Sequence, residues 1–282
     1  MPSPWTEVEP TAWRKRFAAA SRLLQNNHSE RLRDARRGEQ GMPPGRTWLE
    51  LLRFTPSKGY SGVVIRAQVI PRLQELSQDQ WGLVTRRQMA ARGIGKTSIE
   101  LHSGPGGVFE RVATGIYRLA AAPVPDDLEL RAAWLQLEPE IAAWDRTPAQ
   151  GAVSHRSAAS LYGLGHLPAD VHEFTVPRRK GSRRPDVRIH VRELSETELA
   201  EVGGLPVTTP SRIVSDLLWE HEDPEAVAFV AADALRLGYE RPARFAEQLA
   251  AHAHRFGLRK GDGQGLLGVL LDLAGYPHVD AV

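Results

Sequence analysis

The stretch from Gln80 to Ala120 constrains the fold of this chain more than any other part of the sequence. Thr85 stands directly before Arg86–Ala91, where a Thr hydroxyl can cap the free N–H groups of a short helix. Gly93 then suits the left-handed conformation that is common just after a helix. A second short helix is expected over Lys96–Ser103. The stretch therefore predicts two short helices with a tight turn between them.

The residues around these two helices complete the pattern. Ile94 is an apolar residue inside the turn, as a helix-turn-helix requires where its two helices meet. Gly104–Gly107 cannot continue a helix, whereas Val108–Val112 and Gly115–Leu119 are short, rich in β-branched and aromatic residues, and predict a hairpin. Val63–Ser77 fits the helix that usually precedes such a pair. This order of elements predicts a winged helix-turn-helix.

A winged helix of this kind binds DNA by placing its second helix in the major groove. The base edges would lie nearest to the first residues of that helix, Lys96, Thr97 and Ser98. The phosphates would be contacted by three arginines, Arg86, Arg87 and Arg111. Residues 80–120 carry six basic and two acidic side chains, for a net charge of +4. The alternative is a winged helix used only for protein contacts. Glu100 favours it because a carboxylate would repel phosphate, and Ile99 and Leu101 cannot both face the core.

The length and composition of the chain allow two modest domains. It has 282 residues, of which 41% are hydrophobic and 25% charged, as is typical of globular chains. We predict a weakly structured basic extension over 1–60, the winged helix over 61–122, and a C-terminal domain over 126–282, with Ala121–Pro125 as the linker. The expected fold class is α+β, in which the C-terminal domain is mixed α/β with a small sheet and several helices.

Charge is distributed unevenly along the chain. Residues 1–72 hold thirteen basic and six acidic side chains, whereas residues 193–282 hold seven and fifteen. This gradient favours a nucleic-acid partner for the front of the chain. The basic extension is either an arm on the DNA backbone, a tail without a role, or sequence upstream of a true start such as Met42. The absence of Cys, of a membrane-length apolar run and of a signal-peptide core predicts a cytoplasmic protein.

Helical periodicity recurs through the C-terminal domain. Leu128–Trp144 predicts a core-facing helix with the stripe Trp134, Leu137, Ile141 and Trp144. Ser154 is expected to cap a helix over His155–Tyr162. Another helix is expected over Ser211–Trp219, with Thr209 as its cap and Pro210 at its first position. Within it, Arg212 can pair with Asp216, four residues later. Three more helices are expected over Pro224–Leu237, Pro242–Phe256 and Leu266–Leu273, with a loose segment, Gly257–Gly265, before the last.

Two alternating segments, Val171–Val176 and Val187–Arg192, predict strands that form a hairpin. The loop between them carries the densest group of basic residues in the chain: Arg178, Arg179, Lys180, Arg183 and Arg184. Such a loop could grip a nucleic-acid backbone with a steep dependence on salt. A solvated loop without a ligand is an equal alternative.

The sequence offers little support for catalysis. Ser154 and His155 resemble a catalytic pair, but neighbours on a helix point about 100° apart, and no buried carboxylate partner is evident. No Lys has an acidic residue two positions before it, as a restriction-like nuclease needs beside Mg²⁺. Gly181-Ser182 is followed by Asp186 alone, not by the paired Asp residues of a nucleotidyltransferase. The close pair His252 and His254 would diverge on a helix. We therefore expect no enzyme activity, cofactor or metal, and keep a degenerate nuclease as an alternative.

Four runs taken together resemble the AbiEi family of antitoxins from type IV toxin–antitoxin systems, over about residues 66–250. They are GIYRL at Gly115–Leu119, SHRSAASLYGL at Ser154–Leu164, VPRR at Val176–Arg179, and GLPVTTPSRIVSDLL at Gly204–Leu218. The resemblance places the family's recognition helix on Lys96–Ser103. It places the C-terminal motifs on His155–Ala159 and Pro206–Asp216, as structural elements of that domain.

The resemblance implies an antitoxin that also represses its own operon. The winged helix would bind inverted repeats in double-stranded operator DNA, and a palindromic operator would hold two copies of the chain. The C-terminal domain would counteract a nucleotidyltransferase-like toxin encoded alongside, without forming a stable complex. Neither role requires a membrane or a cofactor.

Overall fold

The computed structural model describes residues 69–103 and 107–276. By its internal contacts the chain divides between Arg66 and Ala67, so all described residues belong to one compact unit, Ala67–Val282. The predicted extension over 1–60 and the first part of the predicted helix Val63–Ser77 lie outside the described residues. The described unit combines helices with two small sheets, and the predicted α+β class is confirmed.

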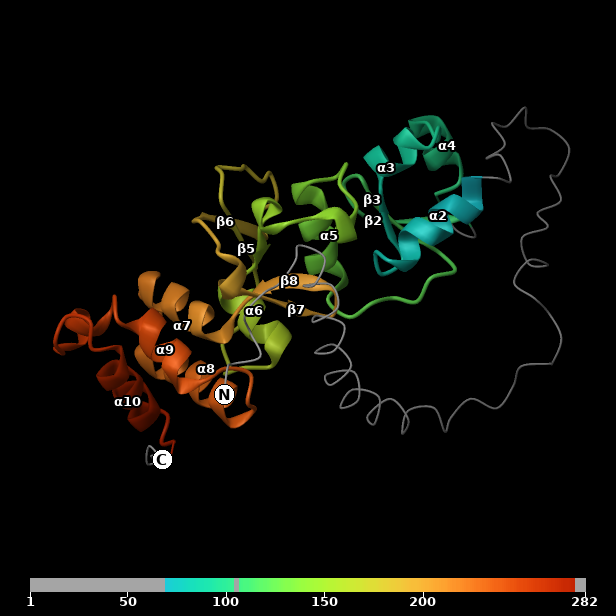
Figure 1. Ribbon diagram of the computed structural model, residues 1–282. Helices are drawn as coiled ribbons and strands as arrows, with labels where there is room; N and C mark the ends of the chain where they lie inside the picture. The colour runs from blue at the N-terminus through green and yellow to red at the C-terminus, as the bar shows by residue number, and fades with distance from the viewer. Residues whose placement is uncertain (1–68, 104–106, 277–282) are drawn as a thin grey trace, which may run out of the picture. The chain divides into compact units, whose positions relative to one another are not determined.

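The first part of the unit is a three-stranded sheet with three helices (Figure 1, blue to green). The sheet has the order β1-β3-β2, and both of its strand pairs are antiparallel. In chain order the elements are α2 (Val69–Gln78), β1 (Leu83–Thr85), α3 (Arg86–Ala91), α4 (Lys96–Leu101), β2 (Phe109–Ala113) and β3 (Ile116–Leu119). The predicted helix pair and hairpin are present with nearly the expected bounds.

Local chemistry accounts for the start and end of the helix pair. The Thr85 hydroxyl accepts a hydrogen bond from the N–H of Gln88, and the Gln88 side chain accepts one from the N–H of Thr85, which is a complete capping box. Gly93 has a φ of 81°, which a non-glycine residue rarely adopts. Helix α4 ends at Leu101, earlier than predicted, because Ser103 already bridges to Phe109 of the sheet.

Helix α5 (Leu128–Leu137) is shorter than predicted. Pro139 disfavours helical geometry at Glu138, the residue before it, and a short 3₁₀ turn at Ala143–Asp145 follows. The predicted stripe is therefore only half correct. Trp134 and Leu137 are buried, whereas Trp144 lies beyond the helix and keeps 38% of its surface exposed.

The second sheet has five strands in the order β6-β5-β4-β8-β7. Strands β5 and β6 pair in parallel, so the predicted hairpin between them is wrong. Because the strands run in the same direction, the connection over 177–186 must lead from the end of β5 back to the level where β5 began. Three of the strands were not predicted, since they are short and β4 has only two residues. The strands are β4 (Ala152–Val153), β5 (His172–Val176), β6 (Val187–Val191), β7 (Leu199–Val202) and β8 (Leu205–Thr208).

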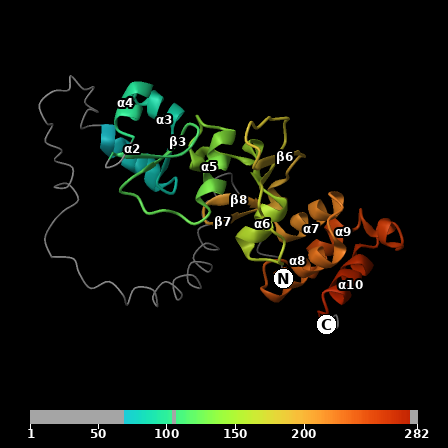
Figure 2. The same cartoon turned by 180° about the vertical axis from the view of Figure 1, so that it is seen from behind.

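Five helices accompany this sheet, and α7, α8, α9 and α10 lie together in both views (orange to red in Figures 1 and 2). The predicted helix starts at His155 and Pro210 are confirmed, but the side chains of Ser154 and Thr209 make no capping hydrogen bond. The segment Gly257–Gly265 is only partly loose because Asp262 caps α10. The helices are α6 (His155–Tyr162), α7 (Pro210–Trp219), α8 (Pro224–Arg236), α9 (Pro242–Leu249) and α10 (Gly263–Leu273). Short 3₁₀ turns lie at Pro148–Gln150, Glu196–Glu198 and Ala253–Phe256.

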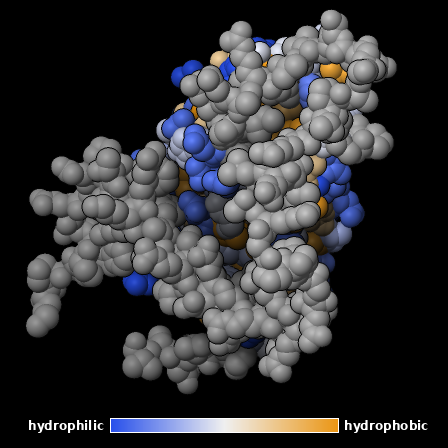
Figure 3. Space-filling view, turned by 90° about the vertical axis from the view of Figure 1, so that its right-hand side faces the viewer, coloured by the Kyte–Doolittle hydropathy of each residue, from blue (hydrophilic) through white to orange (hydrophobic). Residues whose placement is uncertain are grey.

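One core connects the two sheets across the predicted linker. Leu83 and Ile116 belong to the same cluster of buried side chains as Trp134. The indole N–H of Trp81 donates to the carbonyl of Gly203 at 2.9 Å, between β7 and β8. The predicted domains over 61–122 and 126–282 are thus in direct contact. On the face in Figure 3, the described residues that are visible show hydrophilic areas with small apolar ones between them.

Candidate functional site

Three of the predicted DNA-binding side chains surround one hollow on the surface of the helix pair. Arg86, Arg87 and Lys96 are all exposed and line this hollow together with Ala90 and Ile94. Arg86 and Arg87 open α3 directly after Thr85, whose capping box fixes where that helix begins, and Lys96 is the first residue of α4. The hollow therefore presents three cations around an apolar floor, and we call it the basic hollow.

Two of these cations already have carboxylate neighbours. The Arg87 guanidinium lies 2.7 Å from the Glu140 carboxylate, and Lys96 Nζ lies 3.6 Å from the Glu100 carboxylate one turn along α4. All four side chains are more than 60% exposed. Exposed pairs of this kind contribute at most about 1 kcal/mol, so an incoming phosphate can compete with them.

The structure corrects the prediction for one residue of α4. Thr97 is exposed as expected, but Ser98 is buried, with 5% of its surface accessible, and cannot reach a base edge. Ser98 and Ile99 occupy the inward face of the helix. Leu101 is turned outward, with 56% of its surface exposed, as the spacing of Ile99 and Leu101 required.

The two arginines of the hairpin differ in their surroundings. Arg111 on β2 is exposed, as predicted for a phosphate contact. Arg118 on β3 is buried, forms an ion pair with Glu110, and donates to the carbonyl of Ala122. Arg118 therefore contributes to the local structure and adds little to the charge that a ligand would meet.

The predicted basic loop is only partly free. Lys180 forms an ion pair with Glu138, just after α5, and Arg184 binds Asp186 and donates to Gln136 at 3.1 Å. Arg178, Arg179 and Arg183 are exposed. Two of the five cations thus hold the loop against α5, which reduces the charge it offers to a nucleic-acid backbone.

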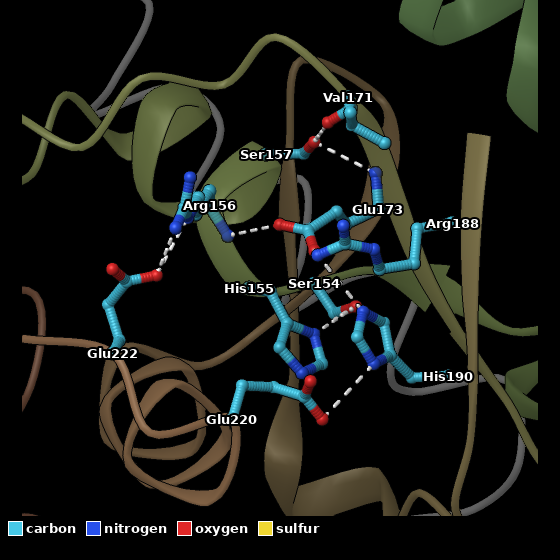
Figure 4. A network of polar contacts seen from close by, with 10 residues as sticks. All are labelled: Ser154, His155, Arg156, Ser157, Val171, Glu173, Arg188, His190, Glu220 and Glu222. Carbon is cyan, nitrogen blue, oxygen red and sulfur yellow. Dashed lines mark hydrogen bonds and ion pairs between the residues drawn. The ribbon is translucent and has the colours of Figure 1, made fainter. Parts of the chain in front are cut away.

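A second group of polar side chains lies between α6, the two parallel strands and the end of α7 (Figure 4). We call Ser154, His155, Glu173, His190 and Glu220 the histidine cluster. The rings of His155 and His190 are stacked, with centroids 3.6 Å apart and planes 15° from parallel. The two residues are 35 positions apart in the chain, so the cluster was not visible as a sequence motif.

Glu173 is the buried anion of this cluster, with 3% of its surface exposed. One carboxylate oxygen accepts from the backbone N–H of Arg156 at 3.0 Å, and the other lies 3.2 Å from Nε2 of His190 and 3.5 Å from the Arg188 guanidinium. The sequence did contain a signal for it. An acidic residue flanked by Val171, Phe174 and Val176 in a predicted strand is costly to bury unless it is paired.

His155 is the most constrained member of the cluster. Its backbone has a φ of 52°, in the left-handed region that costs a non-glycine residue about 1–2 kcal/mol. Its Nδ1 lies 2.9 Å from the Ser154 hydroxyl, whereas its Nε2 is buried without a hydrogen-bond partner among the described residues. Burial lowers the pKa of His155 to about 2, with a further contribution from His190 and neighbouring arginines, so the ring is neutral.

These contacts correct two sequence-based statements about Ser154 and His155. Their polar atoms do not diverge, since they form a hydrogen bond. A buried carboxylate does exist nearby, but Glu173 contacts His190 and not His155. Ser154 is fully buried, so its hydroxyl cannot reach a substrate in this conformation. The close pair considered from the sequence, His252 and His254, is not the pair that the fold brings together.

Two further sets of buried polar side chains are held by ion pairs or hydrogen bonds. Arg212 lies 2.9 Å from the Asp216 carboxylate, as predicted, and also 2.8 Å from the Glu198 carboxylate. Burial raises the pKa of Asp216, with Arg212 opposing the shift. His252 Nε2 lies 2.9 Å from the Ser215 hydroxyl in the interior.

A comparison with models of known protein families gives no match, and neither does a search among curated proteins. Among the described residues, none of the helices combines the length and apolar character needed to cross a bilayer.

Proposed function

We propose that the chain is a DNA-binding antitoxin that represses its own operon, with residues 80–120 as a winged helix-turn-helix. In this proposal α4 lies in the major groove of operator DNA, while the C-terminal part counteracts a nucleotidyltransferase-like toxin. The order α2-β1-α3-α4-β2-β3 and the sheet order β1-β3-β2 support the winged-helix assignment. The resemblance to AbiEi antitoxins in four runs of sequence supports the toxin assignment.

The observation that carries the proposal is the basic hollow. Arg86, Arg87 and Lys96 are exposed around one depression at the N-terminal ends of both short helices. Phosphate contacts supply most of the affinity of a protein for DNA and position it on the duplex. Thr97 follows Lys96 on the exposed face of α4, where it can reach a base edge, and Arg111 is available for the backbone from the hairpin.

A salt series with two matched triple variants tests this assignment. The wild-type chain should bind the region upstream of its own gene, with an affinity that falls between 50 and 200 mM salt, roughly as expected for phosphate contacts. Arg86→Ala/Arg87→Ala/Lys96→Ala should reduce the slope of log affinity against log salt by about 2–3. Arg178→Ala/Arg179→Ala/Arg183→Ala removes equal charge from the basic loop and should change the slope much less.

Two outcomes would contradict the DNA-binding proposal. One is binding that does not respond to salt, and the other is an equal loss in both triple variants, which would indicate attraction to net charge alone. If only the loop variant lost affinity, the basic loop and not α4 would be the DNA-binding surface.

The antitoxin role needs its own experiment, because it does not depend on DNA binding. The neighbouring gene should be expressed with and without this chain, and growth should be measured. Rescue is expected from the wild type and equally from Arg86→Ala/Arg87→Ala/Lys96→Ala, since the proposal assigns toxin neutralisation to the C-terminal part. A chain that never restores growth would overturn the antitoxin role.

One observation favours a second function, a protein-interaction module. The outward face of α4 carries Leu101, an exposed apolar side chain, beside Glu100. An apolar residue and a carboxylate offer nothing to a phosphate backbone, which is contacted by cations and hydrogen-bond donors. In that case Leu101→Ser would release a partner that stays bound at high salt, and the upstream DNA would not be shifted.

A further inference from the structure

We propose that the histidine cluster is a Zn²⁺ site, with His155 Nε2, His190 Nδ1 and the Glu220 carboxylate as ligands. This inference is independent of DNA binding, because it concerns different residues on different elements. His155 begins α6, His190 lies on β6, and Glu220 directly follows α7. A bound ion would therefore tie together three elements that are distant in the sequence.

The first argument is the geometry of the three side chains. One potential ligand atom from each lies within 4.8 Å of the others. His190 Nδ1 is already 3.7 Å from the Glu220 carboxylate. Figure 4 shows the two imidazole rings side by side, with the Glu220 side chain extending toward them from α7.

The second argument is the unpartnered nitrogen. His155 is 1% exposed, yet its Nε2 has no hydrogen-bond partner among the described residues. A buried polar atom without a partner costs about 1–3 kcal/mol, so a structure that retains one calls for an explanation. A metal ion at this position would use the free lone pair directly.

The third argument is the set of groups behind the ligands. A metal-bound imidazole usually donates its other N–H to a carboxylate, carbonyl or hydroxyl, which fixes the tautomer. His190 meets this condition through Nε2, 3.2 Å from the buried Glu173, and His155 meets it through Nδ1, 2.9 Å from Ser154. Both rings are therefore held with the proposed ligand nitrogen free to bind.

Three arginines near the cluster are paired with carboxylates. Arg156 pairs with Glu222, Arg188 with Glu173, and Arg212 with Asp216 and Glu198, so these guanidinium groups are offset by carboxylates. Arg192 lies over the Trp219 ring, 5.2 Å from its centroid. Two carboxylates contact His190: Glu173 lies 3.2 Å from Nε2, and Glu220 lies 3.7 Å from Nδ1, on the side of the proposed ion.

The types of ligand atom indicate which metal ion would bind. Two imidazole nitrogens and one carboxylate oxygen suit Zn²⁺, whereas Mg²⁺ and Ca²⁺ prefer oxygen ligands alone. Three protein ligands leave a fourth position, and Glu220, whose side chain is 46% exposed, opens that position toward solvent.

Binding requires a small rearrangement that is itself observable. Each nitrogen lone pair lies in the plane of its ring, and the two ring planes are nearly parallel, so the imidazoles must tilt toward each other before both can reach one ion. The angle of 15° between their planes should therefore increase in the zinc-bound form.

The test uses the full-length chain, freed of any affinity tag and of metal by a chelator, and then titrated with Zn²⁺ against a chromophoric indicator. One ion per chain is expected. His190→Ala should abolish binding, Glu220→Gln should weaken it at least 10-fold, and Glu173→Gln should weaken it by about 10–100-fold through the orientation of His190. Co²⁺ in place of Zn²⁺ should give visible absorption bands that Glu220→Gln alters.

Two control variants define what would overturn the proposal. His254→Ala and Arg86→Ala/Arg87→Ala/Lys96→Ala leave the cluster intact and should bind one ion as the wild type does. Failure of the wild type to bind Zn²⁺, or equal binding by the wild type and Glu220→Gln, would refute the site. Because Glu220 is half-exposed, its variant remains informative even if His190→Ala does not fold. If His254→Ala lost zinc while the cluster variants kept it, the ion would bind near His254 and not in the histidine cluster.

Discussion

The basic hollow and the histidine cluster both gather charged and polar side chains, but they do so in opposite environments. In the hollow, Arg86, Arg87 and Lys96 are exposed and their pairs with carboxylates are in contact with water. In the cluster, His155 and Glu173 are almost completely buried; His155 is hydrogen-bonded to Ser154, and Glu173 accepts from the N–H of Arg156 on α6. Water screens the first group, whereas in the second it reaches mainly the half-exposed Glu220 side chain.

This difference predicts how each region responds to change. Substitutions in the hollow should alter binding and its salt dependence while leaving the stability of the fold nearly unchanged. Substitutions in and around the cluster should destabilise the fold, because the partners left behind are buried charges or unsatisfied polar groups. The two regions therefore provide controls for each other.

The largest expected effect comes from the ion pairs beside the cluster. Arg212→Met removes the partner of Asp216, which is 1% exposed, and should lower the free energy of unfolding by about 3–5 kcal/mol. Chemical denaturation monitored by fluorescence measures this loss. The double variant Arg212→Met/Asp216→Leu also removes the buried Asp216 carboxylate and should recover most of the loss, because Glu198, the other partner of Arg212, keeps its hydrogen bonds from Ser195. A single variant as stable as the wild type would show that this buried network behaves like the exposed hollow.

A somewhat smaller effect is expected from the protonation of His252. Burial lowers its folded-state pKa to about 4, with Arg255 and Arg192 adding to the shift, while the unfolded value is about 6.5. Between these values the unfolded chain binds a proton that the folded chain does not. Stability should therefore fall as the pH drops from about 6.5 to about 4, by up to about 3 kcal/mol from this residue.

Denaturation midpoints at pH 7.0, 5.5 and 4.5 test this dependence. His252→Gln keeps a polar group near Ser215 but cannot titrate, so its stability should vary less with pH than that of the wild type. His172, whose pKa is also lowered by burial, remains in both proteins and cancels in the comparison. Identical pH dependence in the two proteins would show that His252 does not cause the loss of stability at low pH.

Thr85 is a buried residue that caps the helix carrying Arg86 and Arg87, and its substitution should have an intermediate effect. Its hydroxyl accepts from the Gln88 N–H at 3.0 Å and donates to the Pro139 carbonyl across the predicted linker. Thr85→Ala removes both bonds and should cost about 1–2 kcal/mol, measured as a shift in the denaturation midpoint. Thr85→Ser keeps the hydroxyl and should cost less than half as much. Equal losses in both variants would assign the effect to the missing methyl group.

The sequence predicted best where local chemistry decides the structure. The Thr85 cap, the turn at Gly93, the helix start at Pro210 and the Arg212–Asp216 pair all depend on residues a few positions apart. Helix ends were less accurate, since Pro139 and the bridge from Ser103 to the sheet stop α5 and α4 early.

The predictions failed where distant segments meet. The parallel pairing of β5 and β6 depends on where the chain returns to the sheet, and no local pattern records this. The histidine cluster depends on that pairing, because it places His190 beside Glu173 and opposite His155. Lys180 and Arg184 were predicted as free cations for the same reason, since their partners on or just after α5 are more than 40 residues away.

The smallest expected effect tests the exposed side of the comparison. A double-mutant cycle on Arg87→Ala and Glu140→Ala should give a coupling free energy of only about 0.2–1 kcal/mol, because both side chains are mostly exposed at 2.7 Å separation. Since Glu140 competes with phosphate for the same guanidinium, Glu140→Ala should also raise the affinity for upstream DNA, while Glu247→Ala, which breaks the exposed pair with Arg244, should not. A coupling above 2 kcal/mol, or unchanged DNA affinity in Glu140→Ala, would mean that Arg87 serves the fold and not a ligand. The basic hollow would then share the structural character of the buried cluster.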